Sequence, residues 1–141
     1  MAKQFMCRLI TPHERMLDDE AVTYAQLPLW DGQAGVLTGR APMLAKLGLG
    51  ELRLDFPEGG DRAYLVEGGF VQMVDNRLTV LAELAVPVES ISEQEARAEL
   101  AEAEARKPQS PDEAKAIDKD RRRAQAKLRL AQAFKARGGG I

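Results

Sequence analysis

The sequence has few of the residues that usually build catalytic or metal sites. Among its 141 residues there are one cysteine, Cys7, and one histidine, His13. A single cysteine cannot form an internal disulfide, and a single histidine without cysteine partners makes a poor metal site. Cys7 alternates with Phe5 and Leu9, as a small core residue would, and His13 is expected at the surface of a turn. No GxxxxGK[ST] loop is present, so Walker-type nucleotide hydrolysis is not predicted.

Long apolar runs and a strong net charge are also lacking. No stretch approaches the ~20 apolar residues that span a bilayer, and Arg8 interrupts the first residues before a signal-peptide core could form. The net charge of −2 gives no argument for nucleic acid or an acidic membrane surface. With 45% hydrophobic and 30% charged residues, the composition is that of a globular protein. We expect a cytosolic chain, or one that is bound to a membrane only through other proteins.

Glycine, valine and threonine are missing from most of the second half. Nine of the twelve glycines lie between Gly32 and Gly69, none occurs at residues 70–137, and every valine and threonine lies at or before Val88. Alanine, glutamate, lysine and arginine dominate afterwards, so strand and turn formers come first and helix formers second. We predict an α+β chain with a β domain at residues 1–88 and a helical region at 89–141.

The first region alternates short strand patterns with turn signals. Turns are predicted at residues 57–61 and at Asp75-Asn76, and Gly68-Gly69 marks a bend or bulge. Frequent turns without intervening helices are typical of an antiparallel sandwich or flattened barrel. We expect strands at residues 5–9, 22–27, 51–56, 62–66, 70–74 and 77–82.

The second region has the signals of two helices. Ser92 and Glu95 have capping-box spacing, Pro108 ends the first helix, and Ser110 with Pro111 begins the second, which runs toward three glycines. The short link predicts an antiparallel hairpin. Half of its apolar positions are alanines, which bury little area, so we expect weak docking on the β domain and a hairpin able to detach. These positions are Ala96, Leu100, Ala103, Ile117, Ala124, Leu128, Ala131 and Phe134.

Basic residues are concentrated at residues 121–137, where seven bases and no acid occur. Either they form a solvated helix face, or they pair with an acidic partner. Without interleaved aromatics, single-stranded nucleic-acid binding by stacking is not supported. The loop-rich segment around Trp30 likewise fits an ordinary turn series or a binding edge. A small enzyme near Trp30 is disfavoured, because no carboxylate pair or histidine partner can be assembled and the acidic residues 18–20 fit a solvated turn.

Several segments, in order, resemble the epsilon subunits of F-type ATP synthases. GQAGVLTGRAPML at residues 32–44 resembles the family stretch G-E-x-G-hydrophobic-x-P-G-H-A-P-hydrophobic-L. GELRL at residues 50–54 resembles the strand that follows this stretch, and YLVEGGF at 64–70 and NRLTVLA at 76–82 resemble two later strands. EARA at 95–98 resembles the start of the first C-terminal helix. The resemblance implies a β-sandwich of about ten strands followed by a helical hairpin.

The resemblance also implies a function and its partners. Such a subunit catalyses nothing itself: its sandwich joins the gamma subunit to the c-subunit ring, at the cytoplasmic face of the plasma membrane, and couples proton-driven rotation to ATP synthesis. Its hairpin transiently enters the alpha/beta catalytic head and restrains ATP hydrolysis. The implied gamma and ring contacts are Trp30, Gln33, Thr38, Arg40, Ala41 and Pro42, of which Gln33, Thr38 and Arg40 replace the commoner Glu, Pro and His. The implied contacts to an acidic beta-subunit segment are Arg121, Arg122, Arg123, Lys127 and Arg129.

Nucleotide binding is a further implication with a clear departure. Some members bind ATP through I/L-D-x-x-R-A, whereas residues 93–98 here are EQEARA, which keep only Arg97 and Ala98. Because two acids near a phosphate would repel it, we expect weak or absent ATP binding and no other cofactor or metal. The alternative hypothesis for the whole chain is a free-standing regulatory β-sandwich that binds an acidic partner through its basic helix.

Overall fold

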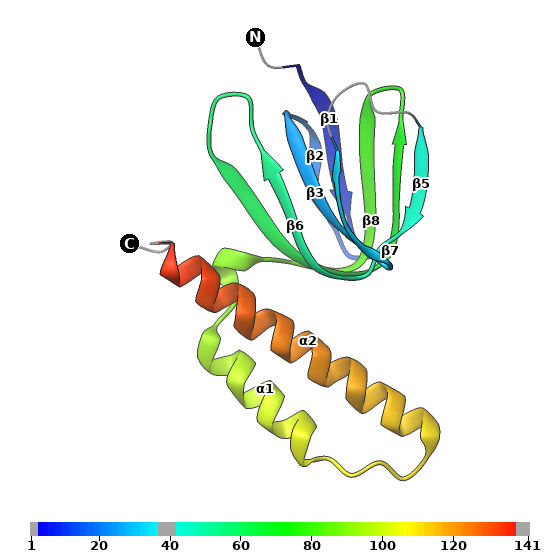
Figure 1. Ribbon diagram of the computed structural model, residues 1–141, viewed down its shortest axis with the longest axis vertical. Helices are drawn as coiled ribbons and strands as arrows, with labels where there is room; N and C mark the ends of the chain where they lie inside the picture. Colours follow the sequence, from blue (N-terminus) through cyan, green and yellow to red (C-terminus); the bar gives the residue numbers. More distant parts are fainter. Residues whose placement is uncertain (1–2, 37–41, 138–141) are drawn as a thin grey trace. The chain divides into compact units, whose positions relative to one another are not determined.

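The computed structural model describes residues 3–36 and 42–137, and the chain divides into two compact units, Met1–Pro87 and Val88–Ile141. In the described residues the first unit contains eight strands and the second contains a short 3-10 turn and two helices (Figure 1). The predicted α+β class, a β-sandwich followed by two helices, is confirmed. The strands are β1 (Phe5–Ile10), β2 (Arg15–Val22), β3 (Tyr24–Leu29), β4 (Gly32–Val36), β5 (Met43–Lys46), β6 (Leu49–Asp55), β7 (Asp61–Val74) and β8 (Arg77–Pro87).

The strands are joined in the order β2-β1-β8-β7-β6-β3-β4, and β5 also pairs with β7. All of these pairings are antiparallel except that between β1 and β8, which is parallel and sets Met6 beside Arg77 and Ile10 beside Leu81. A parallel pair needs a long connection. Here that connection is the whole chain from β2 to β7, and it brings the first strand, β1, into pairing with the last strand, β8.

Gly68 and Gly69 lie inside one long strand instead of separating two strands. Before them β7 pairs with β6, as far as Glu67, and after them it pairs with β5, starting at Phe70. Both glycines have positive φ, and a Cβ on Gly69 would lie 1.9 Å from the Leu81 carbonyl oxygen. Only glycine allows this bend without strain. The expected strands 62–66 and 70–74 are therefore a single strand, one reason why the described residues hold eight strands instead of about ten.

Three further strands were not predicted from the sequence. The acidic residues 18–20, expected in a turn, lie in β2, where Asp19 has a φ of +46° at an irregularity in the pairing with β1. β4 and β5 lie within the segment that appeared rich in loops. Their short lengths and glycines hide the alternation from which strands are recognised. The predicted turn at Asp75-Asn76 is confirmed, with positive φ at both residues, as a two-residue hairpin requires.

The core of the first unit is made of leucine, valine and aromatic side chains. β1 and β6 alternate buried and half-buried residues, as period-two strands do when one face is covered. Cys7 is buried there, which confirms its expected place, and burial raises the pKa of its thiol to about 12. The largest fully buried side chains are Phe5, Leu9, Leu27, Leu52, Leu54, Leu65, Met73 and Leu78.

The second unit is an antiparallel helical hairpin after a 3-10 turn, η1 (Val88–Ser90). α1 spans Glu93–Ala105 and α2 spans Pro111–Ala136. The Ser92 hydroxyl accepts a hydrogen bond from the Glu95 amide at 3.2 Å, and Ser110 accepts one from the Glu113 amide at 3.1 Å. Each serine thereby satisfies an amide that the helix leaves unpaired. The predicted helix starts are both confirmed.

Candidate partner-binding surfaces

The predicted contact residues around Trp30 are exposed where the structure describes them. Trp30 lies at the turn between β3 and β4 with 69% of its side chain accessible. Gln33 is exposed on β4 and accepts a hydrogen bond from Gln26 Nε2 at 3.2 Å, and Pro42 is exposed just before β5. Thr38, Arg40 and Ala41 lie outside the described residues. An exposed indole at a strand turn is suited to a protein contact.

A second surface, which the sequence did not reveal, is an apolar face on the outside of the sheet. Ile10 on β1, Leu81 on β8 and Phe70 on β7 are neighbours across the paired strands, and Leu44 lies on β5 opposite Gln72, two residues along β7 from Phe70. Leu81 is 48% exposed, Phe70 52% and Leu44 73%. Scattered exposed leucines are ordinary, but a continuous apolar row across strands marks an interaction surface. We call Ile10, Leu44, Phe70 and Leu81 the apolar face.

The sequence contained a weak signal for this face. In residues 70–74 both alternate sets are rich in apolar side chains, so alternation alone did not tell the inner side from the outer side. Gln72 is exposed and shares its side with Phe70 and Val74, whereas Val71 and Met73 are buried. Anchoring the alternation on the polar Gln72 would have identified Phe70 as an outward residue.

The apolar face borders a small hollow near the end of β1. The hollow has a volume of about 300 Å³, and its lining includes Ile10, Pro12, Leu81 and Glu83. This volume lies at the lower end of the range for small-molecule sites, and it is sufficient for one apolar side chain of a partner. The geometry therefore favours a protein contact at this face.

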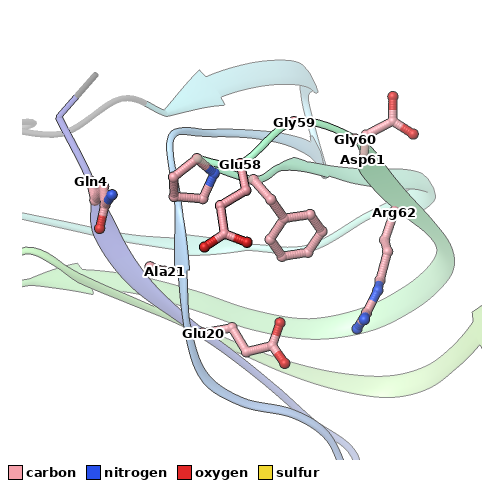
Figure 2. A pocket seen from close by; sticks show the side chains of 10 residues that line it. Gln4, Glu20, Ala21, Glu58, Gly59, Gly60, Asp61 and Arg62 are labelled. Carbon is pink, nitrogen blue, oxygen red and sulfur yellow. The ribbon is translucent and has the colours of Figure 1, made fainter. Parts of the chain in front are cut away.

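A larger hollow lies beside the turn between β6 and β7, with a volume of about 720 Å³. Figure 2 shows the Glu58 carboxylate directed into this hollow and the Asp61 carboxylate directed away from it. The Arg62 guanidinium lies 5.4 Å from the centroid of the Phe56 ring, which is cation–π distance. The polar side chains that line this hollow are Gln4, Glu20, Glu58, Asp61 and Arg62. Within the described residues, no group of three potential ligands is arranged to hold a metal ion.

The predicted basic contacts on α2 are largely engaged within the hairpin. Arg121 and Arg122 both pair with Asp118, and Arg123 Nη1 lies 3.2 Å from Asp120 Oδ1. Lys127 Nζ lies 3.1 Å from Glu99 Oε2 on α1. Arg129 is exposed, and among the described residues no carboxylate pairs with it.

The residues that match the ATP motif are also exposed. Arg97 Nη2 lies 3.0 Å from Glu93 Oε1, an i,i+4 pair on the surface of α1, and Ala98 is exposed beside it. Hydrogen bonds from Gln132 and Arg97 hold the pKa of Glu93 below its ordinary value. Because Glu93 is ionised, its carboxylate would repel a phosphate near Arg97, and it already pairs with the Arg97 guanidinium.

Comparison with known proteins identifies the family. Residues 4–88 match the model of the ATP synthase Delta/Epsilon chain, beta-sandwich domain. The ATP synthase epsilon chain of Rhodopirellula baltica is 41% identical over 126 residues, which cover 89% of this chain and 97% of the relative. That of Symbiobacterium thermophilum is 38% identical over 87% of this chain and 84% of its own length.

Solved structures agree with the sequence comparison. A chain in the cryo-EM structure of the Euglena gracilis mitochondrial ATP synthase OSCP/F1/c-ring assembly superposes with a TM-score of 0.71 and 29% identity, covering 95% of this chain and 81% of that one. A chain in the central stalk/c-ring structure from Tetrahymena thermophila, 15% identical, has the same fold with a TM-score of 0.66 over 92% and 97% of the two chains.

The family match includes the apolar face and the segment around Trp30, since both lie within residues 4–88. Neither α1 nor α2 of the described structure is long and apolar enough to cross a bilayer. The sequence relatives extend past the sandwich through most of the hairpin. The chain belongs to the ATP synthase epsilon chain family.

Proposed function

We propose that this chain is a central-stalk subunit of an F-type ATP synthase, which couples the gamma subunit to the membrane c-ring during proton-driven ATP synthesis. The observation that carries the proposal is the 41% identity to an epsilon chain over 89% of this sequence. The solved structure that is 29% identical comes from an assembly containing F1 and a c-ring. As a stalk subunit, the protein catalyses no reaction itself and is a peripheral component at the cytoplasmic face of the membrane.

The sandwich offers two separate contacts for two partners. The apolar face suits the gamma subunit, because Phe70 and Leu81 present apolar area that a permanent partner would cover. The segment of Trp30, Gln33, Thr38, Arg40, Ala41 and Pro42 suits the polar loops of the c-ring. Gln33 carries no charge where the family commonly has a glutamate, so ring binding by this chain depends less on ion pairing.

The hairpin supplies the regulatory part of the function. Arg121, Arg122, Arg123, Lys127 and Arg129 place positive charge on α2, and an acidic segment of the beta subunit is its complement. Binding of α2 to this acidic segment would restrain ATP hydrolysis by the catalytic head. The same basic helix also fits a free-standing regulatory module, for which no stalk partner would be needed.

The proposal is tested by adding the protein back to a catalytic head depleted of this subunit. We expect the full chain to bind gamma and lower ATP hydrolysis, and a chain ending at residue 88 to bind gamma without lowering it. Leu81→Asp should weaken gamma binding strongly, whereas Ala101→Asp, which adds the same charge at an exposed position of α1, should not. Absence of gamma binding by the full chain would favour the free-standing module.

A further inference from the structure

Two arginines lie on the outside of the sandwich, on the same side of the sheet as the apolar face. Arg8 lies two residues before Ile10 on β1, and Arg77 lies four residues before Leu81 on β8. Residues an even number of positions apart on a regular strand share a side, and the residues between them here are alternately buried. Both arginines therefore border the apolar face.

The carboxylate of Asp19 on β2 pairs with both guanidinium groups. Its Oδ1 atom lies 3.2 Å from Arg77 Nε and 3.9 Å from Arg8 Nε. Within residues 3–36 and 42–137, no other carboxylate pairs with either arginine, so two positive charges face one negative charge. Because each contact uses the Nε edge, the outer nitrogens Nη1 and Nη2 of both groups remain as hydrogen-bond donors.

An irregularity in β2 brings the Asp19 carboxylate to these arginines. The buried residues Leu17 and Val22 are five positions apart, an odd number, so β2 contains one residue more than regular alternation allows. Asp19 has a φ of +46°, in the left-handed region that few residues other than glycine adopt. Bulges redirect side chains, and strain of this kind is concentrated at functional sites. The bulge places one carboxylate beside two arginines at the border of the apolar face.

We infer that Arg8 and Arg77, paired with Asp19, form a binding site for a carboxylate side chain of the protein that covers the apolar face. The inference rests on the proposed function only for the identity of that protein, the gamma subunit. A guanidinium presents parallel N–H groups that match the two oxygens of a carboxylate. The net charge of the cluster, +1, is complementary to the single negative charge of one aspartate or glutamate.

Apolar area beside the cluster defines the partner segment further. Val74 lies opposite Arg77 in the pairing of β7 with β8 and is 41% exposed, and Met6 lies beside Arg77 on β1. The segment that fits this surface therefore places one acidic residue among apolar ones. A partner that covers the apolar side chains also excludes water from the cluster, which strengthens the ion pair.

Substitution of each arginine tests the site in the full chain. Arg8→Gln and Arg77→Gln should each weaken binding to the gamma subunit at least about tenfold, because the carboxylate of the partner would lose its counter-charge at a covered surface. Arg53→Gln is the matched control. Arg53 is 34% exposed, against 29% for Arg8, and it also pairs with one carboxylate, that of Asp55. It lies on β6, which β8 and β7 separate from β1, so R53Q should bind within about twofold of the parent chain.

A lysine substitution separates a shaped site from a general effect of charge. Arg77→Lys keeps a positive charge beside Asp19 but loses the planar fork, so it should still bind gamma more weakly than the parent chain. Affinities are measured by biolayer interferometry, and full recovery by R77K would contradict a fork-shaped site. If R77Q lowers the midpoint of thermal unfolding, R77K takes its place in the comparison with R53Q.

A second readout does not require the gamma subunit. Acetate serves as the probe, and nuclear magnetic resonance of the arginine Nε–H groups reports contact at each guanidinium. We expect acetate to shift the signals of Arg8 and Arg77 at lower concentrations than that of Arg53. Sodium chloride at the same ionic strength is the control for screening.

The outcomes separate this inference from the proposed function. Selective shifts together with weaker gamma binding by R8Q and R77Q would support both. Selective shifts in a parent chain that does not bind gamma would support the carboxylate site and count against the proposed function. The site is overturned, while the stalk function stands, if the parent binds gamma and R8Q and R77Q bind it as tightly as R53Q. Equal acetate shifts for all three arginines would also overturn it.

Discussion

Each of the two units of this protein is stabilised internally by a different kind of interaction. The sandwich buries large side chains such as Leu52 and Leu54, and its first strand pairs with its last, so Met6 lies beside Arg77. In the described residues, the two helices of the hairpin bury five alanines and only one larger side chain, Leu130, and the hairpin relies on serine caps and on ion pairs. The comparison indicates that one short chain can combine a well-packed sandwich with a weakly held hairpin by changing the size of the buried side chains.

The largest expected effect is on the bend in β7. Gly69→Ala should lower the free energy of unfolding of the sandwich by about 3 kcal/mol, since the residue would keep a φ of +100° and its Cβ would meet the Leu81 carbonyl. Urea unfolding, followed by a sandwich signal such as Trp30 fluorescence, measures this loss. Gly59→Ala is the control, because Gly59 has a φ of +95° with nothing within 4 Å, and it should lose only about 1 kcal/mol. Equal losses would show that strain, not the carbonyl contact, dominates.

A smaller effect is expected at the start of α2. Ser110→Ala removes the hydroxyl that accepts the Glu113 amide, and it should destabilise the helix by about 1 kcal/mol. Helix content by circular dichroism at increasing temperature should fall earlier, while the sandwich signal stays unchanged. Gln109→Ala, one residue before the cap, is the matched control. A sandwich signal that moved together with the helix would contradict the separate stability of the two units.

The smallest expected effect is a dependence of hairpin closure on pH. The hydrogen bond from Arg106 lowers the pKa of Asp120, and hydrogen bonds from Gln132 and Arg97 lower that of Glu93. A carboxyl whose pKa is lower in the folded state stabilises that state above its unfolded pKa, and the stabilisation is lost as the pH falls through the folded pKa. The distance between α1 and α2, measured between spin labels on the two helices, should therefore increase as the pH falls below about 4. Added salt should increase the same distance at neutral pH, because it screens the ion pairs. An unchanged distance under both conditions would show that apolar packing, and not ion pairing, is the main contact between the two helices.

Much of the hairpin and part of the sandwich could be predicted from the sequence. Both serine caps and the Asp75-Asn76 turn were recognised because each is completed by residues within a few positions. β4 and β5 were missed because they are short and owe their strand form to pairing with β3 and β7. Of the candidate sites, the exposure of Trp30 was suggested by its loop, but the apolar face was not recognised.

The sequence alone therefore determined the class of each region, the helix ends and the family to which the chain belongs, because these depend on local composition and on ordered motifs. The tertiary structure decided which apolar residues face outward, how β7 passes from β6 to β5 at Gly68-Gly69, and which acid holds Lys127. These features join residues that are far apart in the chain. Their free energy depends on register and packing, which no local pattern contains.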